Sequence, residues 1–468
     1  MTKITKNTII EDVEIIDTSA EGKAVARFDN MVIFCEGGVP GDIVDVCIFR
    51  KKSSFAEGKV VKIKKVSPHR TKPACKYFGT CGGCKWQNLD YQSQLIFKQK
   101  FVQDALVRIG KLDIPPIQTI FANEESYFYR NKLEFSFSNK KWLTLEQIQN
   151  ETKLVDKNAL GFHIPGRFDK VLDVDFCHLQ PDPSNQIRNA VRDYALENNL
   201  GYYDIKAQSG FLRTLMVRIT ATGEVMVVVG VFDLLEKELF GLLEHVKNNF
   251  PEIKSLQYVH SNKGNDSLDG LEIKLYSGRE FIYEEMEGLK FKISAKSFYQ
   301  TNSKQAYNLY KITREFADLK GDELVYDLYT GTGTIANFIS KSCKKVIGVE
   351  YLEDAVKDAF ENSKLNNIGN TFFVAGDMKN VLNEEFIKMH GAPDVIIADP
   401  PRAGMHEDVV RVILKTAPQK IVYVSCNPAT QARDLSMMNE FYKVIKIQPV
   451  DMFPQTAHVE NVVLLEKK

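Results

Sequence analysis

The chain has 468 residues, too many for one ordinary hydrophobic core, which favours about two to four domains. Lys and Arg together number 61, as do Asp and Glu, so overall basicity is excluded as a means of binding nucleic acid. No apolar run reaches membrane-spanning length and the N-terminal segment shows no signal-peptide pattern, so we expect a cytoplasmic protein without membrane contact. Eight cysteines in such a chain suggest metal binding or catalysis rather than disulfides.

Residues 1–70 are predicted to form a small β-barrel of the oligonucleotide-binding type. Short alternating apolar runs are interrupted there by turn residues such as Pro40-Gly41 and Gly58. The overlapping segment 50–72 contains nine basic residues and one acid, Glu57. Such a run is either a solvated face or a track for a phosphate backbone.

A cysteine cluster follows the barrel. Cys75, Cys81 and Cys84 have the spacing C-x5-C-x2-C, and Cys177 lies far downstream. Four thiolates could hold zinc or an iron–sulfur cluster, although zinc ribbons favour two C-x2-C pairs and only one is present. The spacing alone leaves both groups open.

The remaining sequence predicts a central and a C-terminal domain. Residues 71–295 alternate strand-like and helical runs in a mixed α+β pattern, and an amphipathic helix over 91–111 could pack on the catalytic domain. Residues 296–468 repeat strand and helix in the pattern of a doubly wound, Rossmann-like α/β sheet. The fold class is therefore α/β with an N-terminal barrel.

Polar residues follow the predicted strands of the C-terminal domain, where ligands of such sheets bind. The first strand leads into "TGTGT", whose glycines allow close backbone approach, and the second ends in Glu350, which could accept hydrogen bonds from both ribose hydroxyls. The third ends in Asp377, suited to an adenine amino group. A full G-x-G-x-x-G and a Walker lysine are both missing, so we expect a nucleoside without phosphate, such as S-adenosylmethionine (SAM).

Two further strands deliver Asp399 and Cys426 to the same edge. The sequence after Asp399 is Pro-Pro-Arg, with Arg402 where amino-group methyltransferases place an aromatic residue for stacking. A thiolate that adds to carbon 6 of a pyrimidine makes carbon 5 nucleophilic towards SAM, and a base must then remove the carbon-5 proton. In "TAHVEN", His458 and Glu460 are the candidates for that base.

The motifs DPPR (399–402), SCNP (425–428) and HVEN (458–461) together resemble those of the RNA uracil-5-methyltransferases, over nearly the whole chain. The resemblance implies Cys426 as nucleophile and Glu460 as proton-abstracting base. By the same match, the residues expected at the SAM site are Gln300, Tyr329, Thr334, Glu350, Asp377 and Asp399. Those expected at the RNA substrate are Phe298, Arg130 and Lys132. Thr330 and Thr334 depart from the family pattern of Cys and Asn, and Thr334 still offers a hydroxyl for SAM binding.

The resemblance extends to both N-terminal features. The cysteine spacing is similar to that of the subgroup with a [4Fe-4S] cluster, which implies Cys75, Cys81, Cys84 and Cys177 as ligands. The barrel resembles a TRAM domain, an RNA-binding module, which favours the phosphate track over a solvated face.

We therefore expect a monomeric enzyme that methylates carbon 5 of a uridine in 23S ribosomal RNA. Transfer RNA is the alternative substrate, and a catalytically silent RNA-binding assembly factor is the alternative class. A cytosine-5-methyltransferase would carry its cysteine after a proline elsewhere in the sheet. A radical SAM enzyme would need a C-x3-C-x2-C loop, and the chain has neither.

Overall fold

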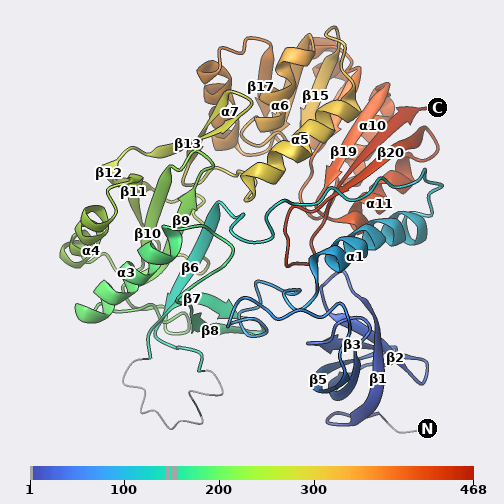
Figure 1. Ribbon diagram of the computed structural model, residues 1–468. Coiled ribbons are helices and arrows are strands. Elements are labelled where there is room, and N and C mark those ends of the chain that lie inside the picture. The colour runs from blue at the N-terminus through green and yellow to red at the C-terminus, as the bar shows by residue number, and fades with distance from the viewer. Residues whose placement is uncertain (1–3, 144–147, 149–156) are drawn as a thin grey trace.

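The computed structural model describes residues 4–143, 148 and 157–468 and contains a barrel, two seven-stranded sheets and a two-stranded sheet (Figure 1). The parts of the predicted domains at 1–3, 144–147 and 149–156 lie outside the described residues. The domain boundaries at 70 and 295 stay predictions. Among the described residues, no helix is both long and apolar enough to cross a membrane.

The predicted N-terminal barrel is confirmed as a closed barrel with strand order β1-β2-β3-β5-β4. Its interior is filled by fully buried side chains that include Ile15, Ile33 and Ile48. Gly58 allows β5 to pack closely against β4, because a Cβ at this position would lie 2.4 Å from the Val46 side chain. The strands are β1 (Ile9–Thr18), β2 (Ala24–Phe28), β3 (Met31–Glu36), β4 (Ile43–Lys51) and β5 (Phe55–Lys65).

The central sheet has the order β12-β11-β10-β9-β6-β7-β8, with helices on one face (Figure 1). Its strands are β6 (Lys132–Ser138), β7 (Ala159–Ile164), β8 (Arg167–Asp173), β9 (Leu212–Ile219), β10 (Val225–Val231), β11 (Ile253–His260) and β12 (Ile273–Gly278). Helices α3 (Ser184–Glu197) and α4 (Glu236–Asn249) pack their apolar sides on it. The hairpin β13 (Phe281–Met286) and β14 (Leu289–Ser294) joins its other face to the C-terminal core.

The C-terminal sheet is doubly wound, as predicted, with the order β17-β16-β15-β18-β19-β21-β20. The first five are parallel, and β21 runs antiparallel between β19 and β20. The strands are β15 (Leu324–Leu328), β16 (Lys345–Glu350), β17 (Thr371–Ala375), β18 (Val395–Ala398), β19 (Lys420–Ser425), β20 (Tyr442–Val450) and β21 (Glu460–Lys467). Strand β20 was not among the predicted strands.

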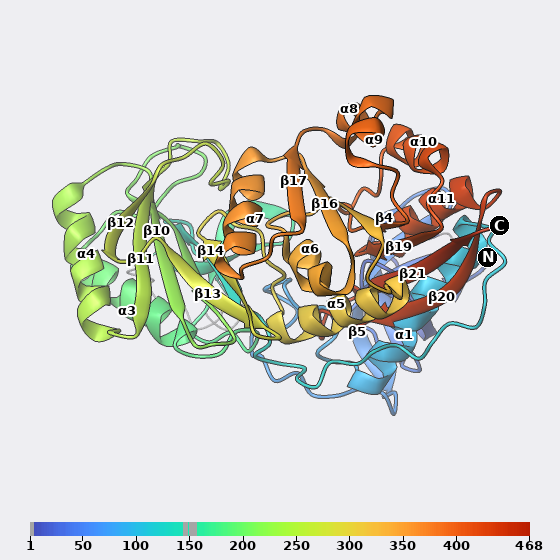
Figure 2. The same cartoon turned by 90° about the horizontal axis from the view of Figure 1, so that it is seen from above.

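Helices cover both faces of this sheet, because alternate strand residues point to opposite cores (Figure 2). One face packs against α5 (Ser303–Ala317), α6 (Thr334–Ile339) and α7 (Glu353–Leu365), with η2 (Ser340–Ser342) after α6. The other packs against α8 (Met378–Val381), α9 (Glu384–His390), α10 (Glu407–Thr416) and α11 (Pro428–Met438).

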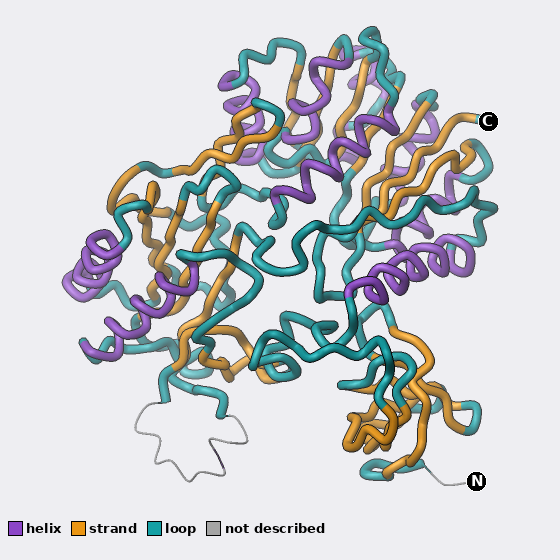
Figure 3. Tube along the Cα trace, in the orientation of Figure 1, coloured by secondary structure: helices purple, strands orange, loops and turns teal. Residues whose placement is uncertain are grey.

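The helix expected over 91–111 is α1 (Tyr91–Asp104), which continues as the π-helix η1 (Ala105–Ile109). As anticipated, it packs on the C-terminal sheet, where Leu95 and Leu106 share a core with Tyr423. The described stretches on either side, 66–90 and 110–131, contain no regular element (Figure 3). Two long loops therefore connect the barrel, this helix and the central sheet.

Candidate active site

Asp399, Cys426 and Glu460 meet at one edge of the C-terminal sheet. Asp399 directly follows β18 and Cys426 directly follows β19, so both stand at carboxyl ends of parallel strands. Glu460 begins the antiparallel strand β21, and the register pairs Ser425, the residue before Cys426, with Asn461, the residue after Glu460. The strand inserted in reverse thus places its first residue beside the nucleophile predicted from sequence.

The surroundings of Asp399, Cys426 and Glu460 raise the pKa of all three groups. Burial raises the pKa of Asp399 to about 7. Burial and the Asp399 charge raise the pKa of Glu460 to about 8. Burial, followed by the Glu460 and Asp399 charges, raises the pKa of the Cys426 thiol to about 11, against a lowering effect of Arg402. Protons therefore exchange near neutral pH at the two carboxyl groups, as general acid–base chemistry requires.

The turn after Cys426 is fixed by Asn427. Its side chain caps α11 by accepting from the Ala429 N–H at 3.1 Å and donates to the Arg402 carbonyl at 3.1 Å. Cys426 opens into a cavity of about 290 Å³. The barrel contributes Ala20 to its lining, the π-helix contributes Arg108, and the last loop contributes His458. The cavity of Cys426 thus lies where the β1–β2 turn of the barrel approaches the π-helix and the loop before β21.

The neighbouring strand ends carry the predicted cofactor residues. The Glu350 carboxylate accepts from the Gly331 and Leu352 N–H groups, both at 3.0 Å. Asp377 caps α8 by accepting from the Lys379 N–H at 3.2 Å. Tyr329 has a left-handed backbone (φ 64°) and lies half-buried, and its pKa is raised to about 12 by burial first and then by charges that include Asp377 and Glu350. These three side chains occupy one region.

Thr334 and Asp327 complete that region. The Thr334 hydroxyl lies 3.2 Å from the Thr332 hydroxyl at the start of α6. Asp327, a residue that sequence reasoning did not select, is the fully buried penultimate residue of β15, and its Oδ2 accepts from Thr330 and, at 3.1 Å, from the Ala336 N–H. Its Oδ1 has no hydrogen-bond partner among the described residues. An Asp inside the apolar run that leads into T-G-T-G was the available signal for this additional candidate cofactor-binding residue.

Phe298 and Gln300 lie between β14 and α5. The Phe298 ring is 68% exposed, and the Gln300 carbonyl accepts from the Asn131 side chain at 2.8 Å. Arg130 lies 5.5 Å above the Phe453 ring, and Lys132 pairs with Glu134 at 2.8 Å. The segments that carry the predicted substrate residues, 130–132 and 298–301, are joined by hydrogen bonds from Asn131 to the carbonyls of Gln300 and Thr301, and Lys132 is engaged in an ion pair.

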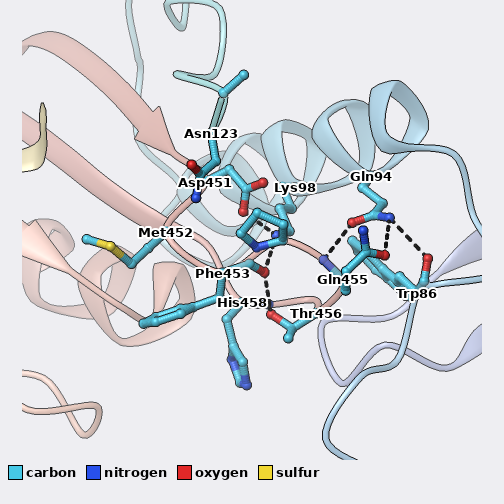
Figure 4. Close-up of polar contacts among 12 residues, drawn as sticks. Trp86, Gln94, Lys98, Asn123, Asp451, Met452, Phe453, Gln455, Thr456 and His458 are labelled. Atoms are coloured by element: carbon cyan, nitrogen blue, oxygen red, sulfur yellow. Dashed lines mark hydrogen bonds and ion pairs between the residues drawn. The ribbon is translucent and has the colours of Figure 1, made fainter. Parts of the chain in front are cut away.

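The loop 451–458, which connects β20 to β21, is held by α1 (Figure 4). Lys98 and Asp451 form a fully buried ion pair at 2.5 Å, and Lys98 also donates to the Phe453 carbonyl at 3.0 Å. The Gln94 side chain donates to Gln455 Oε1 at 3.1 Å and accepts from its backbone N–H at 2.9 Å. These contacts fix the segment that leads into Glu460, and sequence reasoning did not identify them.

The four predicted cluster ligands, Cys75, Cys81, Cys84 and Cys177, line one cavity of about 360 Å³. Burial raises the pKa of Cys84 to about 12 and that of Cys177 to about 11. Within the described part of the chain, no group of three or more His, Cys, Asp or Glu side chains is arranged to hold a metal ion. The structure brings the four cysteines together without forming a site for a single ion.

Some basic residues of the run 50–72 form ion pairs with carboxylates of the barrel. Arg70 binds the fully buried Asp42 carboxylate at 2.5 Å, and Arg50 binds Glu57 at 3.1 Å. Lys64 pairs with Asp12 and Asp45 at 3.6 and 3.5 Å. These three cations stabilise the barrel, so a phosphate track would rely mainly on the other basic residues of the run.

Comparisons with known proteins agree with this geometry. The family described as tRNA (Uracil-5-)-methyltransferase matches residues 271–468, and the TRAM domain matches residues 9–61. An uncharacterized RNA methyltransferase of Bacteroides thetaiotaomicron is 56% identical over 96% of this chain and 99% of its own length. The chain belongs to the RNA uracil-5-methyltransferase family.

Further relatives extend this assignment. An uncharacterized RNA methyltransferase of Porphyromonas gingivalis is 54% identical over 97% of this chain and 99% of its own. A solved tRNA (uracil-54, C5)-methyltransferase of Pyrococcus abyssi, in complex with S-adenosyl-L-homocysteine, is 26% identical. It covers 97% of this chain and 100% of its own, with a TM-score of 0.74. The predicted uracil-5-methyltransferase family and TRAM domain are confirmed, and the protein is a SAM-dependent RNA methyltransferase.

Proposed function

We propose that the protein methylates carbon 5 of a specific uridine in RNA through a covalent bond between Cys426 Sγ and carbon 6 of the base. The observation that carries this proposal is the register of β19 and β21, which sets Glu460 beside Cys426 with Asp399 close enough to raise the pKa of both. A nucleophile and a carboxyl base at one strand edge suit covalent catalysis followed by proton removal.

The side chains act in a fixed order. Cys426 first loses its Sγ proton to solvent. The thiolate then adds to carbon 6, which opens the carbon 5–carbon 6 double bond and makes carbon 5 nucleophilic. SAM supplies the methyl group that carbon 5 takes up. The Glu460 carboxylate removes the carbon-5 proton, and the Sγ–carbon 6 bond breaks as the double bond returns. A base with a pKa of about 8 is well matched to this step near neutral pH.

The cofactor residues suit a nucleoside without phosphate. Glu350 would bind the ribose hydroxyls, Asp377 the adenine amino group, and Tyr329 one face of the ring. The unpartnered Asp327 Oδ1 and the Thr334 hydroxyl would bind polar groups of the methionine moiety, with Gln300 and Asp399 nearer the methyl group. The support is that the side chains of Tyr329, Glu350 and Asp377 already lie together at the ends of β15, β16 and β17.

The RNA substrate has two candidates. We propose 23S ribosomal RNA first, because the cysteine cluster and the TRAM domain together favour it. Transfer RNA is the second candidate, because the solved relative that covers 97% of this chain is named a tRNA (uracil-54, C5)-methyltransferase. In either RNA the target base must leave its stack to reach Cys426. Phe298 and Arg130 would contact it, with Lys132 near the backbone, and we propose that the enzyme acts in the cytoplasm as a monomer.

Tritium release tests the chemistry and the substrate together. Transcripts of 23S ribosomal RNA and of transfer RNA, labelled with tritium at carbon 5 of uracil, are incubated with enzyme and SAM. We expect release from one RNA, its loss in Cys426→Ala, and its retention in Cys47→Ala, a control at a half-buried thiol of the barrel. Release that survives in Cys426→Ala would overturn the covalent mechanism. No release from either RNA would favour a non-catalytic RNA-binding factor.

We also propose that Cys75, Cys81, Cys84 and Cys177 hold a [4Fe-4S] cluster. Zinc would need its sulfurs about 2.3 Å from one point. In a four-iron cluster each thiolate binds a different iron, and four cysteines that line one cavity could supply those thiolates. The cluster would order the loops around it; methyl transfer by this route needs no electron. Protein purified without oxygen should be brown, and a colourless preparation with bound zinc would refute the cluster.

A further inference from the structure

Aromatic side chains gather at the surface beside the cysteine cavity. Tyr127, Phe128, Phe176 and His178 form a connected group, here called the aromatic platform. The Phe176 and His178 rings lie 4.8 Å apart, Phe128 lies 6.3 Å from Phe176 and 6.0 Å from His178, and Tyr127 lies 6.0 Å from His178. Phe128 and Phe176 remain 42% and 38% exposed. Large aromatic rings grouped at a surface indicate a contact surface rather than a core.

The backbone of Phe128, one of the platform residues, is held in a strained conformation. Phe128 has φ 55°, a left-handed conformation that is unfavourable for a bulky residue. Two hydrogen bonds impose it: the N–H groups of Phe128 and Arg130 donate to the carbonyls of His178 and Leu179, both at 2.8 Å. The strained backbone of Phe128 holds an apolar ring at the surface, where the ring contributes little to the stability of the fold. Residues with strained backbone angles concentrate at ligand-binding sites.

The platform is continuous with the catalytic edge. Arg130 lines the same cavity as Phe176 and His178, and its guanidinium lies over the Phe453 ring. Phe453 contacts the His458 ring at 6.4 Å, and His458 lines the cavity of Cys426. Aromatic rings and one cation thus connect the platform to the nucleophile.

We propose that the aromatic platform stacks unpaired bases of single-stranded RNA that flank the target uridine. This inference rests on the proposed function, because a uridine drawn out to Cys426 leaves its neighbours without a stacking partner. Exposed aromatic rings replace such partners for any base, and Arg130 supplies positive charge for the backbone between platform and target. The occupant is single-stranded RNA; a protein partner is the competing outcome.

Fluorescence anisotropy with the full-length protein tests the platform. The probe is a labelled single-stranded RNA of about 12 nucleotides with one uridine, within the usual range of site sizes. We expect Phe128→Ala and Phe176→Ala each to weaken binding by about 5- to 100-fold, the loss of one stacked base. Phe176→Trp should retain binding. The slope of affinity against salt should stay unchanged, because stacking releases no counterions. Phe441→Ala, at a ring that is 51% exposed, is the matched control.

The outcomes separate the platform from the chemistry. Wild-type affinity in both alanine variants, with tritium release intact in the wild type, would overturn the platform and leave the proposed function standing; the role would then pass to a protein partner. Weakened binding in the alanine variants, with no tritium release from any RNA, would keep the platform and overturn the chemistry. If the alanine variants lose both RNA binding and the visible absorbance of the proposed iron–sulfur cluster, the rings only shield the cysteine cavity. That result would also overturn the proposal that the platform stacks bases.

Discussion

At the edge of the C-terminal sheet, the carboxyl groups of Glu350 and Asp377 (the cofactor half) lie in different surroundings from those of Asp399 and Glu460 (the catalytic half). Burial raises the pKa of Asp327 to about 7, so this residue resembles the second pair although it lies in the cofactor region. In the cofactor half, Glu350 accepts two backbone N–H groups, and Asp377 accepts one and lies 3.4 Å from the Lys379 ammonium. In the catalytic half, burial raises the pKa of Asp399 to about 7 and that of Glu460 to about 8.

The difference separates binding from reaction. The hydrogen bonds that Glu350 and Asp377 accept fix the orientation of their carboxyl groups, which suits recognition of hydroxyl and amino groups. Carboxyl groups held in a desolvated site exchange protons near neutral pH, which suits a general base. The same edge can therefore bind a cofactor with one set of side chains and move a proton with the other.

The largest expected effect is on the catalytic half. Glu460→Gln should permit addition of Cys426 and methyl transfer but prevent removal of the carbon-5 proton. Turnover should fall by about 10²- to 10⁴-fold, and a covalent RNA–protein adduct should survive denaturing electrophoresis. The double variant Cys426→Ala/Glu460→Gln, which cannot form the bond, is the control. If no adduct forms while turnover falls, Glu460 is not the base.

The catalytic half also depends on a residue far away in the chain. Lys98→Met leaves the Asp451 carboxylate buried without its cation, so the free energy of unfolding should fall by about 3–5 kcal/mol. Urea unfolding measures it. Lys100→Met, two residues along the same helix, removes a partly exposed pair with Asp17 and should cost at most about 1 kcal/mol. Equal losses in the two variants would show that the buried pair has no special role.

Much of this edge could be predicted because each residue follows an apolar run. Strands β16, β18 and β19 are buried on both faces, so their sequences are largely continuous apolar stretches, and Asp399 and Cys426 come directly after two of them. Glu460 was selected through the HVEN motif, and its position beside Cys426 follows only from the antiparallel insertion of β21.

The other features of the site could not be predicted, because no local sequence pattern indicates them. Strand β20 contains Lys443, Lys446 and Pro449, which interrupt the apolar pattern that predicts a central strand. The Lys98–Asp451 pair joins positions 353 residues apart, and burial of an ion pair cannot be inferred from either residue alone. The aromatic platform likewise depends on a pairing of segments 128–130 and 178–179 that only the fold reveals.

A smaller effect sharpens the role of the cofactor half. Glu350→Gln keeps the side-chain shape but removes the charge that strengthens hydrogen bonds to ribose hydroxyls. We expect SAM to bind about 10- to 100-fold more weakly, the equivalent of about 1.5–3 kcal/mol. Isothermal titration calorimetry measures this, with Glu353→Gln, on the exposed first turn of α7, as control. Unchanged affinity in Glu350→Gln would remove Glu350 from the cofactor site.

The smallest expected effect is on the pH dependence of the free energy of unfolding. The folded protein raises the pKa of Glu460 from 4.5 to about 8, so between these values it binds a proton that the unfolded chain has released. The free energy of unfolding should therefore fall as pH rises from about 5 to 7, by up to about 1.4 kcal/mol per pH unit from this group. Glu460→Gln should flatten that slope, whereas Glu466→Gln, near the other end of β21, should keep it. Parallel slopes in wild type and Glu460→Gln, from urea unfolding at several pH values, would show that burial does not raise the pKa of Glu460.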